Sequence, residues 1–267
     1  MEVLAAYTSD VLPHRATRRN IGYTIKSLSR WWSGKNITEV TARTCREYAA
    51  TKTPAGAAGD LKTLRAAIKH WQTEHGRLAV QPIVWMPPAG PGRERWLTRS
   101  ELARLLRAAQ AQHIRRFILL AYYTGSRPGV ILRLQWGQID LSAGVMARRA
   151  IGEAVHAKKR APRVRLGKRI LAHLRRWKRL DGEAVRYLCH YEGRVVSDPH
   201  AAWKRTVRDA GLGGITRHTI RHTRATHLVQ AGVSLWDAAG ALGMTVKTLE
   251  AVYGHHHPDW QRNVADV

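Results

Sequence analysis

Apolar residues recur at helical spacing through the first part of the chain. Between Thr17 and Trp32 they stand three or four positions apart, with basic residues between them. The same spacing over residues 41–50 and 60–75 predicts a second and a third helix, the last ending at Gly76. Because this spacing gathers apolar side chains on one face, it predicts a helical domain with its own core.

Prolines and glycines then interrupt every periodic pattern. Pro82, Pro87, Pro88 and Pro91 lie close together, with Gly90 and Gly92 among them. A stretch of this composition is typical of a linker. We therefore predict a helical domain over residues 1–80, a linker over 81–95 and a second domain over 96–267.

The second domain combines helical patterns with a short region of alternating positions. A Thr98–Glu101 capping box starts its first helix. Further helices are expected over residues 114–123, 168–180, 199–210, 218–230, 234–242 and 246–252. Alternation predicts a small antiparallel sheet from strands over 145–149, 153–156 and 163–166, and a further short strand near 186–189. The predicted fold class is mainly α with a small antiparallel β-sheet, an α+β arrangement.

Charge narrows the class of ligand. The chain has 45 Lys and Arg residues against 19 Asp and Glu, a formal net charge of +26. Such a surplus is typical of a protein that binds a polyanion, because neutralising phosphates releases condensed counterions. No stretch approaches the roughly 18 apolar residues of a membrane span, and the N-terminus lacks the basic and apolar regions of a signal peptide. We therefore favour nucleic acid over a membrane as the partner.

Basic side chains cover the polar faces of the first and third predicted helices. For any single helix, a solvated surface is the ordinary explanation. Their recurrence on two helices of so basic a chain favours contact with DNA. The candidate contacts are Arg18, Arg19, Lys26 and Arg30 on the first helix and Lys62, Arg65 and Lys69 on the third.

The two cysteines, Cys45 and Cys189, are far apart and stand in no metal-ligand spacing. They form no disulfide framework of the kind seen in small secreted proteins. We expect both to be reduced core thiols of a cytoplasmic protein.

The C-terminal part of the chain carries a candidate phosphate site. His218 and Arg221 stand at positions i and i+3 of a predicted helix, so both side chains leave it on one face. A phosphate group can bridge an imidazole and a guanidinium placed in this way. A later predicted helix presents a single tyrosine, Tyr253, at its end.

These residues carry a family resemblance. The segment HTIRHTRATHLVQAGVSLWDAAGALG, followed by TVKTLEAVYGH, resembles the C-terminal signature of the tyrosine recombinase (phage integrase) family, here of the prophage type. That signature contains an H-x-x-R box, an LG box and a tyrosine, in this order. Upstream, AYYTGSRPGVILRLQWGQID resembles the first arginine box of the family, with its arginine at Arg127. Two boxes far apart and in the right order are much more specific than either one alone.

The resemblance implies an architecture and an activity. Members have a helical core-binding domain, a linker and a catalytic domain, which form a clamp around the duplex. They are site-specific recombinases or integrases that cut and rejoin duplex DNA through a 3′-phosphotyrosyl intermediate, without metal or ATP. The implied partners are double-stranded DNA, three further copies of the chain in a tetrameric synaptic complex, and accessory DNA-bending proteins.

The resemblance also implies roles for four residues. Arg127 and Arg221 would bind the phosphate, because a guanidinium is a fixed fork that stays charged and grips two oxygens. Tyr253 would be the nucleophile, and its phenol must lose a proton to attack. His218 is the expected proton acceptor or hydrogen-bond partner.

In the family, a lysine on a β-hairpin protonates the departing 5′ oxygen. Lys158, Lys159 and Arg160 all fall in the predicted hairpin. We choose Lys158 as the general acid and leave Lys159 open, since the offset to the following strand is ambiguous by one residue. Lys159, Arg160 and Arg224 are further candidate DNA contacts.

One position departs from the family pattern. The LG box usually continues with histidine, or sometimes tryptophan, where this chain has Met244. Methionine offers no N–H donor to a phosphate. We hypothesise that His255, directly after the nucleophile and its glycine, supplies the missing contact.

Two alternatives remain beside this interpretation. The histidines at 218, 222 and 227 and the run 255–257 suggest zinc, but the segment lacks the glutamate of the zincin motif, so we predict no metal site. A basic DNA-binding protein without chemistry, or an inactive prophage integrase remnant, would share the charge and the helices. The complete set of Arg127, His218, Arg221 and Tyr253 argues against a mere binding protein.

Overall fold

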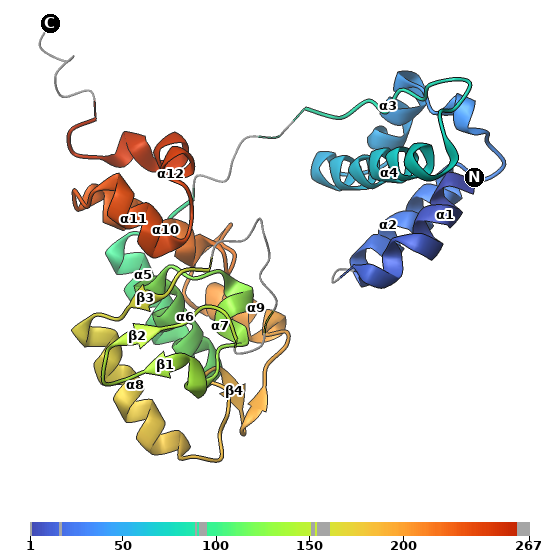
Figure 1. The fold of residues 1–267 in the computed structure, drawn as a ribbon. Coiled ribbons are helices and arrows are strands. Elements are labelled where there is room, and N and C mark those ends of the chain that lie inside the picture. Colours follow the sequence, from blue (N-terminus) through green and yellow to red (C-terminus); the bar gives the residue numbers. More distant parts are fainter. Residues whose placement is uncertain are drawn as a thin grey trace, which may run out of the picture. The chain divides into compact units, whose positions relative to one another are not determined.

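The structure, a computed structural model, describes residues 2–15, 18–88, 90, 95–150, 153 and 161–260. The chain divides into two compact units, Met1–Arg93 and Glu94–Val267 (Figure 1). Helices dominate both units, and the described strands are short and antiparallel. The predicted fold class, mainly α with a small antiparallel sheet, is confirmed.

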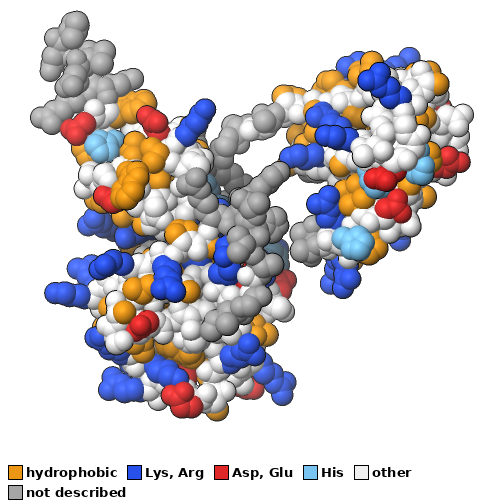
Figure 2. Space-filling model, in the orientation of Figure 1, with side chains coloured by type: hydrophobic (Ala, Val, Ile, Leu, Met, Phe, Trp, Pro, Cys, Tyr) orange, Lys and Arg blue, Asp and Glu red, His pale blue; other side chains and the backbone are white. Residues whose placement is uncertain are grey.

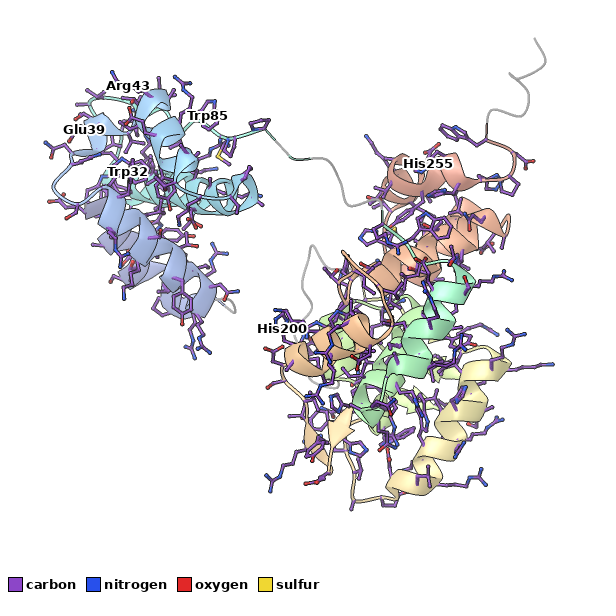
Figure 3. All side chains as sticks on the ribbon, turned by 180° about the vertical axis from the view of Figure 1, so that it is seen from behind. Trp32, Glu39, Arg43, Trp85, His200 and His255 are labelled. Carbon is purple, nitrogen blue, oxygen red and sulfur yellow. The ribbon has the colours of Figure 1, made fainter. Side chains whose placement is uncertain are left out.

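The described part of the first unit is helical. Its α-helices are α1 (Glu2–Asp10), α2 (Arg18–Trp31), α3 (Ala42–Ala50) and α4 (Pro54–His75), and 3-10 turns cover Leu12–His14 and Ile37–Glu39. The long helix α4 packs against the other three. Trp32 lies in the interior of this unit, fully buried (Figure 3).

Two helix boundaries differ from the expectation. No helix is expected before Thr17 from the sequence, but α1 buries Val3, Leu4 and Tyr7 in the core. Helix α4 begins at Pro54, ahead of the expected start at residue 60. Thr53 caps it by accepting a hydrogen bond from the Gly56 amide, and proline suits the first helical position.

The predicted linker begins too early. The Ile83 amide donates to the Val40 carbonyl (2.9 Å), and Val84, Trp85 and Met86 pack against the core of the first unit. Apolar side chains stabilise an irregular segment as well as a helix, so prolines that end the helical pattern do not end the packing. The first unit therefore extends through residue 86.

The second unit is built mainly of helices. These are α5 (Arg99–Ala108), α6 (Gln112–Thr124), α7 (Pro128–Leu132), α8 (Lys168–Asp181), α9 (His200–Asp209), α10 (Thr219–Gln230), α11 (Leu235–Leu242) and α12 (Val246–Tyr253). The Thr98–Glu101 capping box is present at the start of α5. Helices α10, α11 and α12 lie together at one end of this unit, away from α8 (Figure 1).

The strands are shorter than the sequence predicts. One antiparallel sheet has the order β1 (Ile139–Asp140), β2 (Val145–Met146), β3 (Val164–Arg165), in which Val145 pairs with both Asp140 and Arg165. The expected strand over 153–156 lies outside the described residues except for Glu153, which is not in a strand. Near 186–189 there is only an isolated bridge at Tyr187, and a hairpin of β4 (His190–Tyr191) and β5 (Arg194–Val195) follows instead.

A buried ion pair connects helices α6 and α8 of the second unit. Arg116 on α6 donates to both carboxylate oxygens of Asp181 on α8, at 2.7 Å each, and both side chains are almost fully buried. Trp136 Nε1 also donates to this carboxylate, and His190 lies 3.2 Å from it. These contacts hold the pKa of Asp181 below its usual value, although burial alone would raise it. Removing either partner would leave the other as an uncompensated buried charge, which is strongly destabilising.

Both cysteines are free and buried, as predicted. Burial raises the pKa of each thiol, that of Cys189 to about 12. Neither thiol is therefore a nucleophile at neutral pH. Among the helices described here, none is long and apolar enough to cross a membrane.

Candidate active site

The turn that carries Arg127 is shaped by a glycine. Helix α6 ends at Thr124, and Gly125 follows in the left-handed conformation with φ +59°. A Cβ at Gly125 would overlap the Leu242 side chain of α11, so this turn and α11 pack in close contact. Arg127 is the N-cap residue of α7, with Pro128 in the first helical position, where its fixed φ suits a helix start.

One face of helix α10 carries Arg221 and His222, and His218 at the N-cap lies on the same face. Arg221 is 5% exposed, and its Nη1 donates to the Gly125 carbonyl. This bond attaches the second arginine of the signature to the turn that carries the first. The rings of His218 and His222 are edge-to-face, with centroids 4.9 Å apart.

Tyr253 lies at the end of α12, and its side chain is 6% exposed. Its ring packs in a small apolar cluster that includes Val229 and Leu249. Its hydroxyl lies 2.5 Å from Nδ1 of His222. His218 is the expected partner of this hydroxyl, whereas the structure places His222 there, one helical turn further on.

Arg148 is a site residue that the sequence analysis missed. It follows strand β2, and its side chain is 6% exposed. Nε donates to Ser126 Oγ (2.8 Å), and Nη2 donates to the carbonyls of Thr124 (2.8 Å) and Ala241 (2.5 Å). Arg148 therefore ties the sheet to the Arg127 turn and to the end of α11.

The hydrogen bonds from Nε and Nη2 of Arg148 all go to neutral oxygens, and its Nη1 is buried without a hydrogen-bond partner among the described residues. Burial lowers its pKa to about 9, and repulsion from Arg221 and Arg127 adds to the effect. Burial and Arg127 likewise lower the pKa of Arg221 to about 10. Cations held this close favour an anion among them, because the anion relieves their mutual repulsion.

The same field acts on the tyrosine and on His218. Burial raises the pKa of Tyr253, and the Arg221 charge opposes that rise. Desolvation lowers the pKa of His218, with Arg221 and Arg127 contributing. At neutral pH the phenol is therefore protonated and the His218 ring is uncharged.

The remaining candidates of the second unit are Arg224 and three basic residues of the predicted hairpin. Lys158, Lys159 and Arg160 fall among residues that the structure does not describe. Arg224 is half-buried, and its guanidinium stacks on the Tyr122 ring, 5.6 Å from the centroid. This stacking fixes Arg224 beside the turn of Gly125, whose nearest neighbours include its Cγ atom.

Met244 and His255 have different neighbours in the structure. Met244 packs against the apolar cluster that holds Tyr253. His255 is exposed near the end of this group and packs on His256 with centroids 4.0 Å apart (Figure 3). The His256 ring in turn contacts Trp96, which also contacts His227. Through His256, His255 is linked to Trp96 and His227 by ring contacts. The structure gives no support to its predicted role beside the phosphate.

The candidate DNA contacts of the first unit are all exposed: Arg18, Arg19, Lys26, Arg30, Lys62, Arg65 and Lys69. Figure 2 shows Lys and Arg side chains over the visible surface of each unit, with few Asp or Glu side chains among them. Within the described part of the chain, no group of three His, Cys, Asp or Glu side chains is placed to hold a metal ion.

The second unit thus combines a buried tyrosine hydroxyl, an imidazole in contact with it and three mutually interacting arginines. A phenol and a group of guanidinium cations placed in this way resemble the residue set of the tyrosine recombinase boxes. The sequence model of the phage integrase family matches residues 95–259. The chain belongs to the phage integrase family.

Relatives and solved structures agree with this assignment. The chain is 30% identical over 184 residues to the integrase of Salmonella phage P22, covering 64% of this chain and 45% of that protein. It is 26% identical over 182 residues to the tyrosine recombinase XerD of Neisseria meningitidis, covering 63% of this chain and 60% of XerD. The chain spans about half the length of the curated relatives it matches.

The fold is similar to that of solved integrases. A lambda integrase dimer bound to a COC′ core site has a TM-score of 0.74 at 18% identity, covering 94% of this chain and 76% of that one. The Tn1549 transposon integrase in complex with transposon right-end DNA has a TM-score of 0.72 at 16% identity, covering 99% and 98%. At these identities the likeness establishes the fold.

Proposed function

We propose that the protein is a site-specific DNA recombinase or integrase of prophage type, which cuts and rejoins duplex DNA through a 3′-phosphotyrosyl intermediate. The observation that carries the proposal is the placement of the buried Tyr253 side chain in the field of Arg221, which interacts in turn with Arg127 and Arg148. A phosphodiester repels nucleophiles, so its attack depends on positioning and on fixed positive charge. At this site His222 contacts the Tyr253 hydroxyl, and the arginines supply fixed positive charge.

In the proposed reaction, Arg127 and Arg221 hold the non-bridging oxygens of the scissile phosphate. The Tyr253 oxygen loses its proton and forms a bond to phosphorus, and the bond from phosphorus to the 5′ oxygen breaks. The departing 5′ oxygen takes a proton, which the family resemblance assigns to Lys158, with Lys159 as the alternative. Rejoining reverses these steps, because the phosphotyrosyl bond conserves the energy of the broken phosphodiester.

The proposal extends to partners. We propose that the exposed basic residues of the first unit contact duplex DNA and that the two units together form the clamp, with residues 87–95 as the linker. A tetramer of the chain, assisted by accessory DNA-bending proteins, would form the synaptic complex in the bacterial cytoplasm. The integrase structures with DNA, which include a lambda integrase tetramer bound to a Holliday junction, support this assembly by similarity.

The proposal is tested by trapping the covalent intermediate. Purified protein is incubated with nicked duplexes of randomised sequence, in which the short fragment beyond the cut diffuses away and prevents rejoining. We expect SDS-resistant adducts in which the DNA is attached through its 3′ phosphate. Strong duplex binding without any adduct would instead indicate a DNA-binding protein without chemistry.

Cleavage is expected to survive EDTA. In this site arginines supply the positive charge that magnesium supplies in many other phosphoryl transfers. The measurement is the rate of adduct formation with and without chelator. A rate that falls on chelation and returns with added zinc or magnesium would contradict the proposed chemistry.

Affinity for duplex DNA is expected to fall steeply with salt. If about six phosphates are contacted, the association constant should drop by about 10³-fold between 50 and 200 mM salt, since each contact releases counterions. Fluorescence anisotropy over this range measures the slope. A nearly flat dependence would contradict extensive contact with the DNA backbone.

A further inference from the structure

We infer that His222, rather than His218, takes the proton from the Tyr253 hydroxyl. The inference rests on the proposed function, since it assigns a step of the same cleavage reaction. It also gives a role to an imidazole that the H-x-x-R box leaves out, because His222 is the residue directly after that box.

The geometry favours transfer to His222. The Tyr253 oxygen and His222 Nδ1 are 2.5 Å apart, and their rings are 5.9 Å apart between centroids. A phenol that donates to Nδ1 requires the tautomer with its proton on Nε2, so Nδ1 carries the lone pair that accepts the proton. A candidate base must lie within hydrogen-bond reach of the proton it removes, and His222 meets this condition.

The tyrosine needs such an acceptor. Its hydroxyl is almost fully buried, and burial raises its pKa despite the opposing charge of Arg221. A buried phenol does not ionise spontaneously at neutral pH. The proton must therefore leave along the hydrogen bond that already exists.

His218 has a different environment. It is the N-cap residue of α10, and the charges of both Arg221 and Arg127 act on its ring. It contacts the His222 ring edge-to-face, which helps to fix the orientation of that ring. His218 is thus a neighbour of the phosphate-binding arginines, and His222 is the neighbour of the nucleophile.

This division of roles bears on Met244. Once His222 Nδ1 has accepted the proton, the imidazolium lies beside the oxygen that now joins Tyr253 to phosphorus. It is then a charged N–H donor at the phosphate, of the kind that Met244 lacks. During rejoining, the same proton returns from Nδ1 to the tyrosine oxygen as the bond to phosphorus breaks.

The test compares His222→Ala with His227→Ala. His227 lies on the same helix and also contacts a tyrosine hydroxyl, that of Tyr122 at 3.1 Å, but it lies beside Trp96 instead of the catalytic tyrosine. Adduct formation is measured in a single turnover at saturating protein, together with duplex affinity and melting temperature. His222→Ala should slow cleavage by about 10²-fold with duplex affinity unchanged. His227→Ala should change the rate by no more than a few-fold.

Two further measurements separate proton transfer from packing. Added imidazole should restore part of the rate of His222→Ala, because a free imidazole can occupy the cavity and accept the proton. A substrate with sulfur in place of the 5′ bridging oxygen should not restore it, because sulfur relieves only the need to protonate the leaving group. His222→Gln, which keeps a polar side chain of similar reach but is not a base, should remain slow.

Three results would overturn the inference. They are a wild-type rate in His222→Ala, a loss in that variant that imidazole fails to relieve although the protein folds and binds DNA, and imidazole rescue of His218→Ala instead. In each of these the wild-type protein still forms adducts. Absence of adducts from the wild-type protein would instead contradict the proposed function itself.

Discussion

Tyr253→Phe is expected to abolish covalent attachment to DNA while leaving duplex affinity nearly unchanged. The substitution removes one oxygen atom. This oxygen is hydrogen-bonded to His222 Nδ1 and lies in the field of Arg221. The phenyl ring keeps its place among Val229 and Leu249, so α12 should stay packed on α10 and α11. The readout is the yield of SDS-resistant adduct on nicked duplexes, beside affinity from anisotropy.

Tyr122→Phe is the matched control for this variant. The Tyr122 hydroxyl is also hydrogen-bonded to a histidine of α10, His227. The control therefore removes an equivalent hydrogen bond. It should keep the ability to form adducts, because Tyr122 lies outside the arginine cluster. Adducts that persist in Tyr253→Phe would show that another residue is the nucleophile.

The helices and the family boxes were accessible from sequence because both are local patterns. Periodicity identified α2, α3 and α10 to within a residue or two. Short strands are harder, since the described strands are two residues long and depend on cross-strand pairing rather than on alternation. The packing of residues 83–86 on the first unit depends on tertiary contacts that no local pattern contains.

The same distinction between local patterns and tertiary contacts applies to the site residues. Arg127, Arg221 and Tyr253 were found because the family boxes contain them. Arg148 belongs to neither box, and its role depends on contacts with Thr124 and Ala241, far away in sequence. The choice between His218 and His222 depends on how α12 meets α10, which helical spacing does not determine. The only local signal for Arg148 was an arginine at the end of a predicted strand, and charge of that kind is ordinarily solvated.

Arg148→Met is expected to slow cleavage by about 10²- to 10³-fold, because a displaced Arg127 turn would misplace the charge that acts at the reacting centre. Arg148 holds the Arg127 turn through Thr124 and Ser126, and it holds the end of α11 through Ala241. Methionine fills similar space but leaves those oxygens without their donor, at a cost of about 1–3 kcal/mol for each buried group left unsatisfied. The melting temperature should therefore fall as well. The cleavage rate is measured well below it, at saturating protein.

Three companion variants separate the positioning role of Arg148 from a general loss of stability. Arg149→Met makes the same charge change at the next residue and should keep most of the rate. Arg148→Lys should stay slow, because one ammonium group cannot replace a planar fork that reaches Ser126 and two carbonyls. Ser126→Ala should lose part of the rate, and combining it with Arg148→Met should add little, since both act through one contact. A folded Arg148→Met protein that cleaves within a few-fold of wild type would contradict the positioning role, and full rescue by lysine would reduce that role to charge alone.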